Sequence, residues 1–135
     1  MATVFTKIIR GDIPCHKVAE TDRYLAFLDI NPVAEGHILC VPKQETDYIF
    51  DLEDDLLGGL FIFAKKVGRA AESVIDCQRV GVLVVGTEVP HAHVHIIPFQ
   101  NHKQMHLGAP KLEFSQEELA ATAQKIATAY RDSDV

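Results

Sequence analysis

The chain has 135 residues, a formal net charge of −6 and 47% hydrophobic residues. This length suits a single domain over residues 1–135 with its own core, and the composition excludes a disordered chain. The acidic balance argues against a nucleic-acid binder with a broad basic surface, and no apolar run approaches the ~20 residues that span a bilayer.

The cellular compartment is indicated by the N-terminus and by the cysteines. The first seven residues lack the apolar core of a signal peptide. Cys15, Cys40 and Cys77 are odd in number and scattered, which favours free thiols over a disulfide framework. We therefore expect a cytoplasmic protein that contacts no membrane.

The predicted elements come from apolar spacing and turn residues. Asp51 is the expected N-cap of the first long helix, and Ser115 with Glu118 forms a capping box for the last one. In chain order we predict strands over 16–20, 24–29 and 38–41, a helix between 53 and 75, strands over 80–85 and from residue 91, and a helix over 115–130. This order predicts an α+β fold with a mostly antiparallel five-stranded sheet and two main helices.

The last predicted strand carries three histidines in five residues. His91, His93 and His95 alternate with Ala92 and Val94. In a strand, such alternation puts the three imidazoles on one face at steps of about 6.6 Å. An imidazole has two ring nitrogens that need partners when buried, so a face that only needed filling would use aliphatic side chains. The pattern therefore indicates a functional site.

Two kinds of chemistry suit this pattern. Three histidines could hold a zinc ion, but Glu88 is the sole nearby candidate for a further ligand, so we expect no functional metal and no cofactor. Nucleophilic catalysis fits better. An imidazole attacks phosphorus readily when one nitrogen is free and the other N–H is held by an acceptor, and a second histidine can assist the leaving group.

Four segments resemble the histidine-triad (HIT) family. The triad followed by Ile96 and Ile97 is similar to its signature, in which histidines alternate with apolar residues. The likeness continues in three further stretches, in the family's order: 5–14, 24–32 and 35–43, the last being similar to the family's Gly-His-x-Leu-apolar-apolar-Pro-Lys motif.

The resemblance implies catalytic roles for four histidines. His93 would be the nucleophile that takes a nucleotidyl group, and His95 would contact the phosphate and assist the leaving group. His91 and His37 would orient the triad. The implied reaction is hydrolysis of nucleoside phosphoramidates or dinucleoside polyphosphates, which releases a nucleoside monophosphate.

The resemblance also implies the nucleotide site and the quaternary structure. Asp29 would accept hydrogen bonds from the ribose, and the substrate would be a purine nucleotide containing AMP or GMP. The family forms homodimers whose two sheets join into one continuous sheet. The other implied nucleotide-binding residues are Phe5, Ile8, Phe27, Ile30, Glu88 and Val89.

The chain departs from the family at several positions. Thr3 and Thr6 stand where zinc-binding members have cysteines, so that zinc site should be absent. Val80 stands where many members have an asparagine, which would remove a neutral donor near the phosphate. Glu88 replaces a hydroxyl residue and would either repel the phosphate or accept a proton from a cationic leaving group.

Two alternatives to a hydrolase stay open. One is a nucleotidyl transferase, in which another acceptor replaces water. The other is a nucleotide-binding regulatory protein with weak turnover. His16, His102 and His106 are expected on the surface, although the segment 103–106 resembles one that helps shape the site in the phosphoramidate-hydrolase branch.

Overall fold

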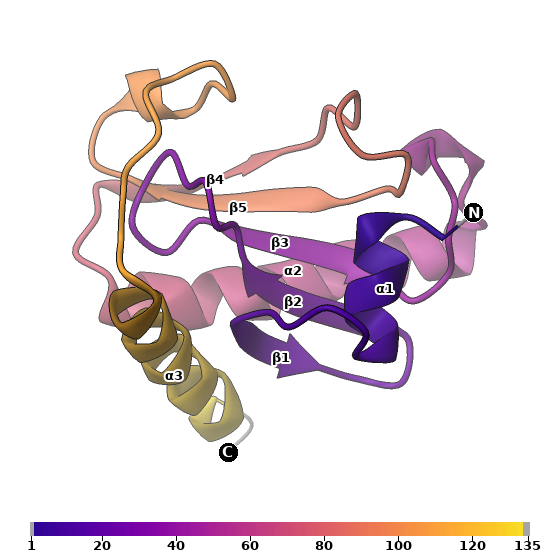
Figure 1. Ribbon diagram of the computed structural model, residues 1–135, viewed down its shortest axis with the longest axis horizontal. Coiled ribbons are helices and arrows are strands. Elements are labelled where there is room, and N and C mark those ends of the chain that lie inside the picture. The colour runs from indigo at the N-terminus through magenta and orange to yellow at the C-terminus, as the bar shows by residue number, and fades with distance from the viewer. Residues whose placement is uncertain (1, 134–135) are drawn as a thin grey trace.

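The structure is a computed structural model that describes residues 2–133, and its centre is the predicted five-stranded antiparallel sheet (Figure 1). Every pairing is antiparallel. Within residues 2–133, no helix is both long and apolar enough to span a membrane. The strand order is β1 (Lys17–Glu20), β2 (Tyr24–Leu28), β3 (Ile38–Pro42), β5 (Val94–Phe99) and β4 (Arg79–Leu83).

Two long helices, both predicted from the sequence, cover one face of the sheet. They are α2 (Asp54–Val74) and α3 (Gln116–Asp132), and their apolar sides form the main core with the sheet. The capping box of Ser115 and Glu118 is confirmed, whereas the predicted N-cap of α2 is wrong. Asp51 ends a short 3₁₀ helix, η1 (Ile49–Asp51), and Glu53 is the N-cap without a side-chain hydrogen bond.

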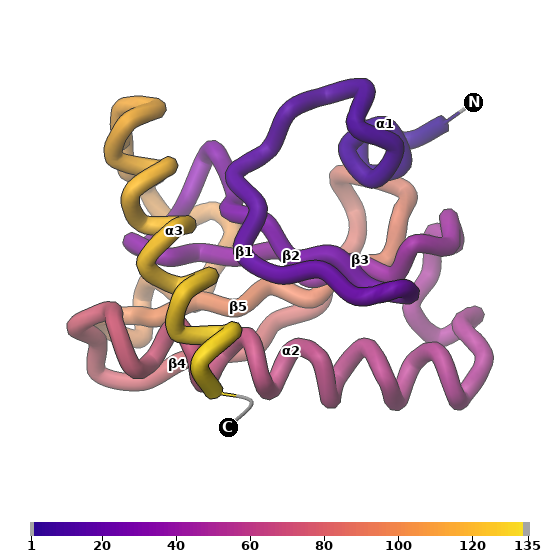
Figure 2. The backbone as a smooth tube through the Cα atoms, turned by 90° about the horizontal axis from the view of Figure 1, so that it is seen from below, coloured from indigo at the N-terminus to yellow at the C-terminus, as the bar shows by residue number. Residues whose placement is uncertain are grey.

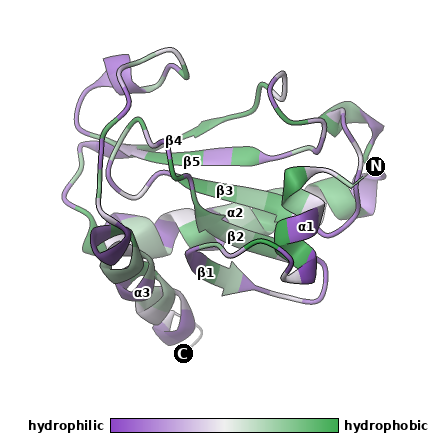
Figure 3. Ribbon diagram, viewed as in Figure 1, coloured by the Kyte–Doolittle hydropathy of each residue, from purple (hydrophilic) through white to green (hydrophobic). Residues whose placement is uncertain are grey.

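The opposite face carries a third helix, α1 (Val4–Arg10), which the sequence analysis missed (Figure 2). Thr3 caps it by accepting a hydrogen bond from the Thr6 N–H, and Gly11 ends it at φ 85°, a backbone conformation that favours glycine. Phe5, Ile8 and Ile9 pack it onto the sheet. The strands are largely hydrophobic, as expected for a sheet covered on both faces, whereas α3 is hydrophilic on its outer side (Figure 3).

The strand register places apolar side chains next to the histidines. Phe27 pairs with Leu39, Leu39 pairs with His95, and His95 pairs with Leu83. Paired residues share a face, so this row lies on the α1 side across four strands. Val94 and Ile96 point to the main core instead.

The predicted geometry of the triad is wrong in part. Strand β5 begins only at Val94, so His91 and His93 precede it. The ring centroids of His93 and His95 are 4.9 Å apart, less than the ~6.6 Å step of a regular strand. The chain bends at His91, before the strand begins, and the His93 Nδ1 lies 2.7 Å from the His91 carbonyl oxygen.

Candidate active site

His93 has one ring nitrogen engaged and the other available. Its Nδ1 lies 2.7 Å from the His91 carbonyl oxygen, which can only accept, so Nδ1 carries the proton. The lone pair of the neutral ring is therefore on Nε2, and within the described residues no hydrogen bond engages that atom. Burial, the largest influence, lowers the pKa of His93 and keeps the ring neutral, although the His91 carbonyl, Asp29 and Glu88 oppose it. This arrangement is that of an imidazole nucleophile.

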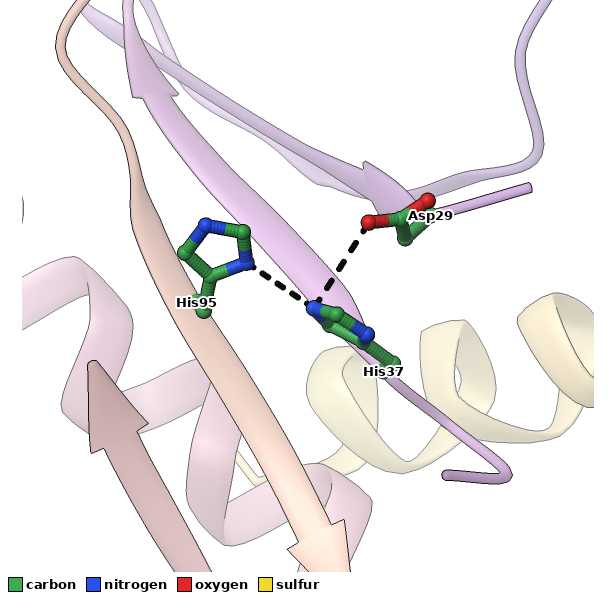
Figure 4. A group of neighbouring side chains, drawn as sticks. All are labelled: Asp29, His37 and His95. Atoms are coloured by element: carbon green, nitrogen blue, oxygen red, sulfur yellow. Dashed lines mark hydrogen bonds and ion pairs between the residues drawn. The ribbon is translucent and has the colours of Figure 1, made fainter. Parts of the chain in front are cut away.

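The His37 ring lies between Asp29 and His95 and contacts both (Figure 4). The backbone N–H of Val33 donates to His37 Nδ1 at 3.2 Å, so the His37 proton is on Nε2. His37 Nε2 lies 2.9 Å from His95 Nδ1 and donates to it. His95 must then carry its proton on Nε2. The chain of hydrogen bonds thus determines the tautomer of His95.

The Nε2 atom of His95 is buried and has no hydrogen-bond partner among the described residues. The side chain is 4% exposed. Burial lowers the pKa of His95 to about 3 and that of His37 to about 4, with further lowering from neighbouring positive charge. A buried donor without a partner is costly, so this N–H is suited to an incoming acceptor such as a phosphoryl oxygen.

The same histidines form one group with metal-ligating potential. Candidate ligand atoms of Asp29, His37 and His95 all lie within 4.8 Å of one another. A metal at His37 Nε2 would require the proton to move to Nδ1, where it would face the Val33 N–H. It would also replace the hydrogen bond between the two rings. The positions of the protons in this group therefore favour a hydrogen-bonded pair of histidines over a metal centre.

His91 is held in a network that also fixes α1. Its Nε2 lies 2.9 Å from the Pro42 carbonyl oxygen and donates to it, so its Nδ1 accepts from the Thr3 hydroxyl at 3.0 Å. Glu45 completes the network by accepting from the Thr6 hydroxyl at 2.6 Å and from the Thr3 N–H at 2.9 Å. Hydroxyls thus tie the first triad histidine to the helix that carries Phe5.

A cavity of about 220 Å³ opens between α1 and the sheet, beside the triad. It brings together all but two of the residues expected to bind nucleotide, with Asp29 at its polar end. The Asp29 Oδ1 accepts from the Asn31 N–H at 2.8 Å, and burial raises the pKa of the carboxyl group. The expected residues in its lining are Phe5, Ile8, Phe27, Asp29 and Ile30.

Two expected residues, Glu88 and Val89, lie outside the lining of this cavity. The Phe5 ring is edge-on to His93 with centroids 5.0 Å apart. Val89 packs against the apolar cluster of Phe5. Glu88 is exposed and acts on His93 through its charge. The expectation for Val80 is wrong, because this side chain packs on the α2 side of the sheet and cannot approach a phosphate at the triad.

Three features of the site were missed by the sequence analysis. Lys111 lies close enough to lower the pKa values of Asp29, His37 and His95 through its charge. Its segment is held by the Leu112 N–H, which donates to the Pro32 carbonyl at 2.8 Å. Glu45 and Asp47 also approach the triad region. Only long-range packing brings these residues in, so local sequence carries no signal for them.

Comparisons with known proteins identify the family of the chain. The HIT domain model matches residues 10–102. An adenosine 5′-monophosphoramidase of Schizosaccharomyces pombe is 37% identical over 134 residues, covering 95% of this chain and 98% of the relative. One from Saccharomyces cerevisiae is 33% identical, covering 98% of this chain and 85% of the relative.

A solved structure shares both fold and sequence with the chain. It is a HIT-like protein from Bartonella henselae with a TM-score of 0.81 and 30% identity, covering 94% of this chain and 95% of the solved one. The family model spans more than half of the chain, and the relatives match over nearly its whole length. The protein therefore belongs to the HIT domain family.

Proposed function

We propose that the protein hydrolyses purine nucleoside 5′-phosphoramidates through a nucleotidyl group on His93. The observation that carries this proposal is the pair of complementary atoms at the site. His93 offers a free lone pair on Nε2, and the adjacent His95 offers a buried N–H without a partner. A nucleophile beside a preorganised donor matches what phosphoryl transfer requires.

The reaction then proceeds in two displacements. In the first, His93 Nε2 bonds to phosphorus as the bond between phosphorus and the amine nitrogen breaks, and the departing nitrogen takes up a proton from water while the His95 N–H donates a hydrogen bond to a phosphoryl oxygen. In the second, water attacks phosphorus, the bond to His93 breaks, and the proton of the water passes to solvent. The products are one amine and one nucleoside monophosphate, and no redox partner is needed.

The remaining residues position the substrate in this proposal. Asp29 accepts from the ribose hydroxyls, and Lys111 offsets charge on the α-phosphate. His37 sets the tautomer of His95, and His91 fixes the loop and α1. The base lies between the apolar side chains that line or adjoin the cavity: Phe5, Ile8, Phe27, Ile30 and Val89.

The activity named for the two yeast relatives supports the phosphoramidate substrate. Dinucleoside polyphosphates are the second candidate substrate. A nucleotidyl transferase would use the same His93 intermediate with another acceptor, and a regulatory nucleotide-binding protein would keep the cavity with slow turnover. A steady-state hydrolysis assay with water as the sole acceptor separates the hydrolase from the transferase and from the regulatory protein.

A homodimer fits the open edge of the sheet. Strand β4 has a neighbour on one side only among the described strands, and Val82 is 54% exposed on it. Ile62 of α2 is 73% exposed. Unpaired strand edges with apolar side chains invite a second strand, so two β4 strands would join the sheets across a twofold axis. Sedimentation should then give about twice the 15.0 kDa chain mass.

The cytoplasm is the proposed compartment, because the three cysteines are free thiols.

Replacement of the nucleophile tests the proposed function. His93→Ala should abolish hydrolysis of an adenosine phosphoramidate while AMP still binds, since the cavity residues are intact. The matched control is His102→Ala, which removes an exposed histidine. Retention of more than a few per cent of the wild-type rate by His93→Ala would assign the nucleophile elsewhere.

A further inference from the structure

One polar cluster at the triad contains a carboxylate that the proposed reaction does not use. Glu45 is exposed, yet its Oε1 accepts two hydrogen bonds from the start of α1, one from the Thr6 hydroxyl at 2.6 Å and one from the Thr3 N–H at 2.9 Å. The Thr3 hydroxyl lies in turn 3.0 Å from Nδ1 of the fully buried His91. The cluster therefore joins three segments that lie far apart in the sequence.

The number of protons in the cluster fixes the direction of each hydrogen bond. His91 Nε2 donates to the Pro42 carbonyl, so Nδ1 of this ring can only accept. Each threonine hydroxyl has one proton to give. The Thr6 proton goes to the carboxylate, over the short distance typical of a charge-assisted bond, and the Thr3 proton is left for His91. Without Glu45, the Thr6 hydroxyl can donate to His91 from 3.4 Å instead. The Thr3 hydroxyl can then turn to Thr6 at 3.2 Å, and the arrangement is no longer unique.

A second route runs from Glu45 to the nucleophile along the backbone. The carbonyl of the next residue, Thr46, accepts a hydrogen bond from the Ala92 N–H at 2.7 Å. That N–H belongs to the same planar peptide unit as the His91 carbonyl, and in a trans peptide the two groups point in opposite directions. The Thr46 carbonyl therefore holds the His91 carbonyl toward His93 Nδ1, which lies 2.7 Å away.

We propose that Glu45 is a positioning residue for the reaction of His93. It anchors its own segment to α1 and directs the Thr3 hydroxyl to His91, so the His91 carbonyl stays on the Nδ1 proton of His93. That proton keeps the lone pair on Nε2, the atom that attacks phosphorus. A carboxylate suits this role because it accepts from two donors and offers none. The inference rests on the proposed function and adds to it the residue that keeps the nucleophile in one tautomer.

The tautomer of His93 can be measured without any turnover. Long-range ¹H–¹⁵N spectra of the wild type, labelled in its histidine rings, should show one His93 form, protonated on Nδ1. Glu45→Leu has a similar size and no acceptor, so it should give a mixture of the Nδ1–H and Nε2–H forms. Glu45→Gln should stay close to the wild type, since its amide oxygen can accept the same two bonds. Urea unfolding of each variant shows that it is folded under the conditions of the spectra.

Hydrolysis of an adenosine phosphoramidate gives the second readout. Glu45→Leu should lower kcat roughly five- to tenfold, the effect of about one lost hydrogen bond, with a smaller change in KM. In the Thr6→Val background the same substitution should cost less, because no Thr6 hydroxyl is left to compete for His91. Glu117→Leu, an exposed substitution in the first turn of α3, is the matched control and should keep the wild-type kcat.

The two proposals fail in different ways. A single His93 tautomer in Glu45→Leu, or an unchanged kcat in that variant, would overturn the positioning role and leave the phosphoramidase activity intact. Equal losses of kcat in the wild-type and Thr6→Val backgrounds would also contradict it. Absence of turnover by the wild type on every phosphoramidate would overturn the proposed function. The spectra of Glu45→Leu and the wild type would still decide whether Glu45 sets the tautomer of His93.

Discussion

Adjacent glycines in α2 should respond to alanine with opposite signs. A Cβ on Gly58 would meet no atom within 4 Å, and the position is exposed, so Gly58→Ala should stabilise the fold by about 1 kcal/mol through helix propensity. A Cβ on Gly59 would overlap the Tyr24 hydroxyl oxygen and lie 2.9 Å from its Cζ. Tyr24 donates to the Leu56 carbonyl at 2.9 Å in a buried hydrogen bond.

The cost at Gly59 follows from these contacts. Overpacking costs about 1–3 kcal/mol, and a buried hydroxyl without its partner costs about as much again. After the gain of about 1 kcal/mol in helix propensity is subtracted, Gly59→Ala should lower the free energy of unfolding by about 1–5 kcal/mol. Urea unfolding of both variants measures this, and Tyr24→Phe should recover part of the loss in Gly59→Ala. A Gly59→Ala protein as stable as Gly58→Ala would refute the packing argument.

Three further predictions concern the histidines and their supports. His37 and His95 should stay neutral in the folded protein down to about pH 4 and pH 3, as an NMR titration of the ring protons would show. In the unfolded chain both histidines take up a proton near pH 6.5. The free energy of unfolding should therefore fall as the pH drops below 6.5, by up to about 1.4 kcal/mol per pH unit for each histidine. A free energy of unfolding that does not change with pH would contradict this. Gln104 donates to the Val33 carbonyl at 3.1 Å and so holds the backbone that sets the His37 tautomer. Gln104→Met should therefore lower kcat roughly three- to tenfold with little change in KM. A change in KM alone would place the role of Gln104 in substrate binding. Exhaustive chelation should leave hydrolysis intact, because His37 Nε2 holds a proton that a metal would displace; activity lost with zinc and restored by it would reverse this conclusion.

Much of the fold was predictable because its signals are local. The alternation of apolar residues in the strands, the helical spacing after Glu53 and the capping box at Ser115 each involve neighbours in the chain. The short helix α1 was missed, although Thr3 as N-cap and Gly11 after its end are recognisable signals. Seven residues are too few for apolar spacing to stand out, and α1 depends on packing against the sheet.

The site was predictable in its residue types but not in its geometry. Alternation identified the three histidines, yet strand β5 begins only at Val94, after His93. The tautomer of His95 depends on the backbone of Val33, which the fold brings to His37. Lys111 reaches the site from a segment that follows β5 by more than ten residues. Such contacts arise from tertiary packing, which no local pattern reports.

The central claim is that His93 carries the nucleotidyl group during turnover. Rapid acid-free quenching of the wild type with an adenosine phosphoramidate, followed by peptide mass spectrometry, tests it most directly. We predict one adenylyl group per chain, bonded through nitrogen to His93, appearing within the first turnover and disappearing as AMP is released. An adduct on another residue, or full turnover with none at any quench time, would contradict the account.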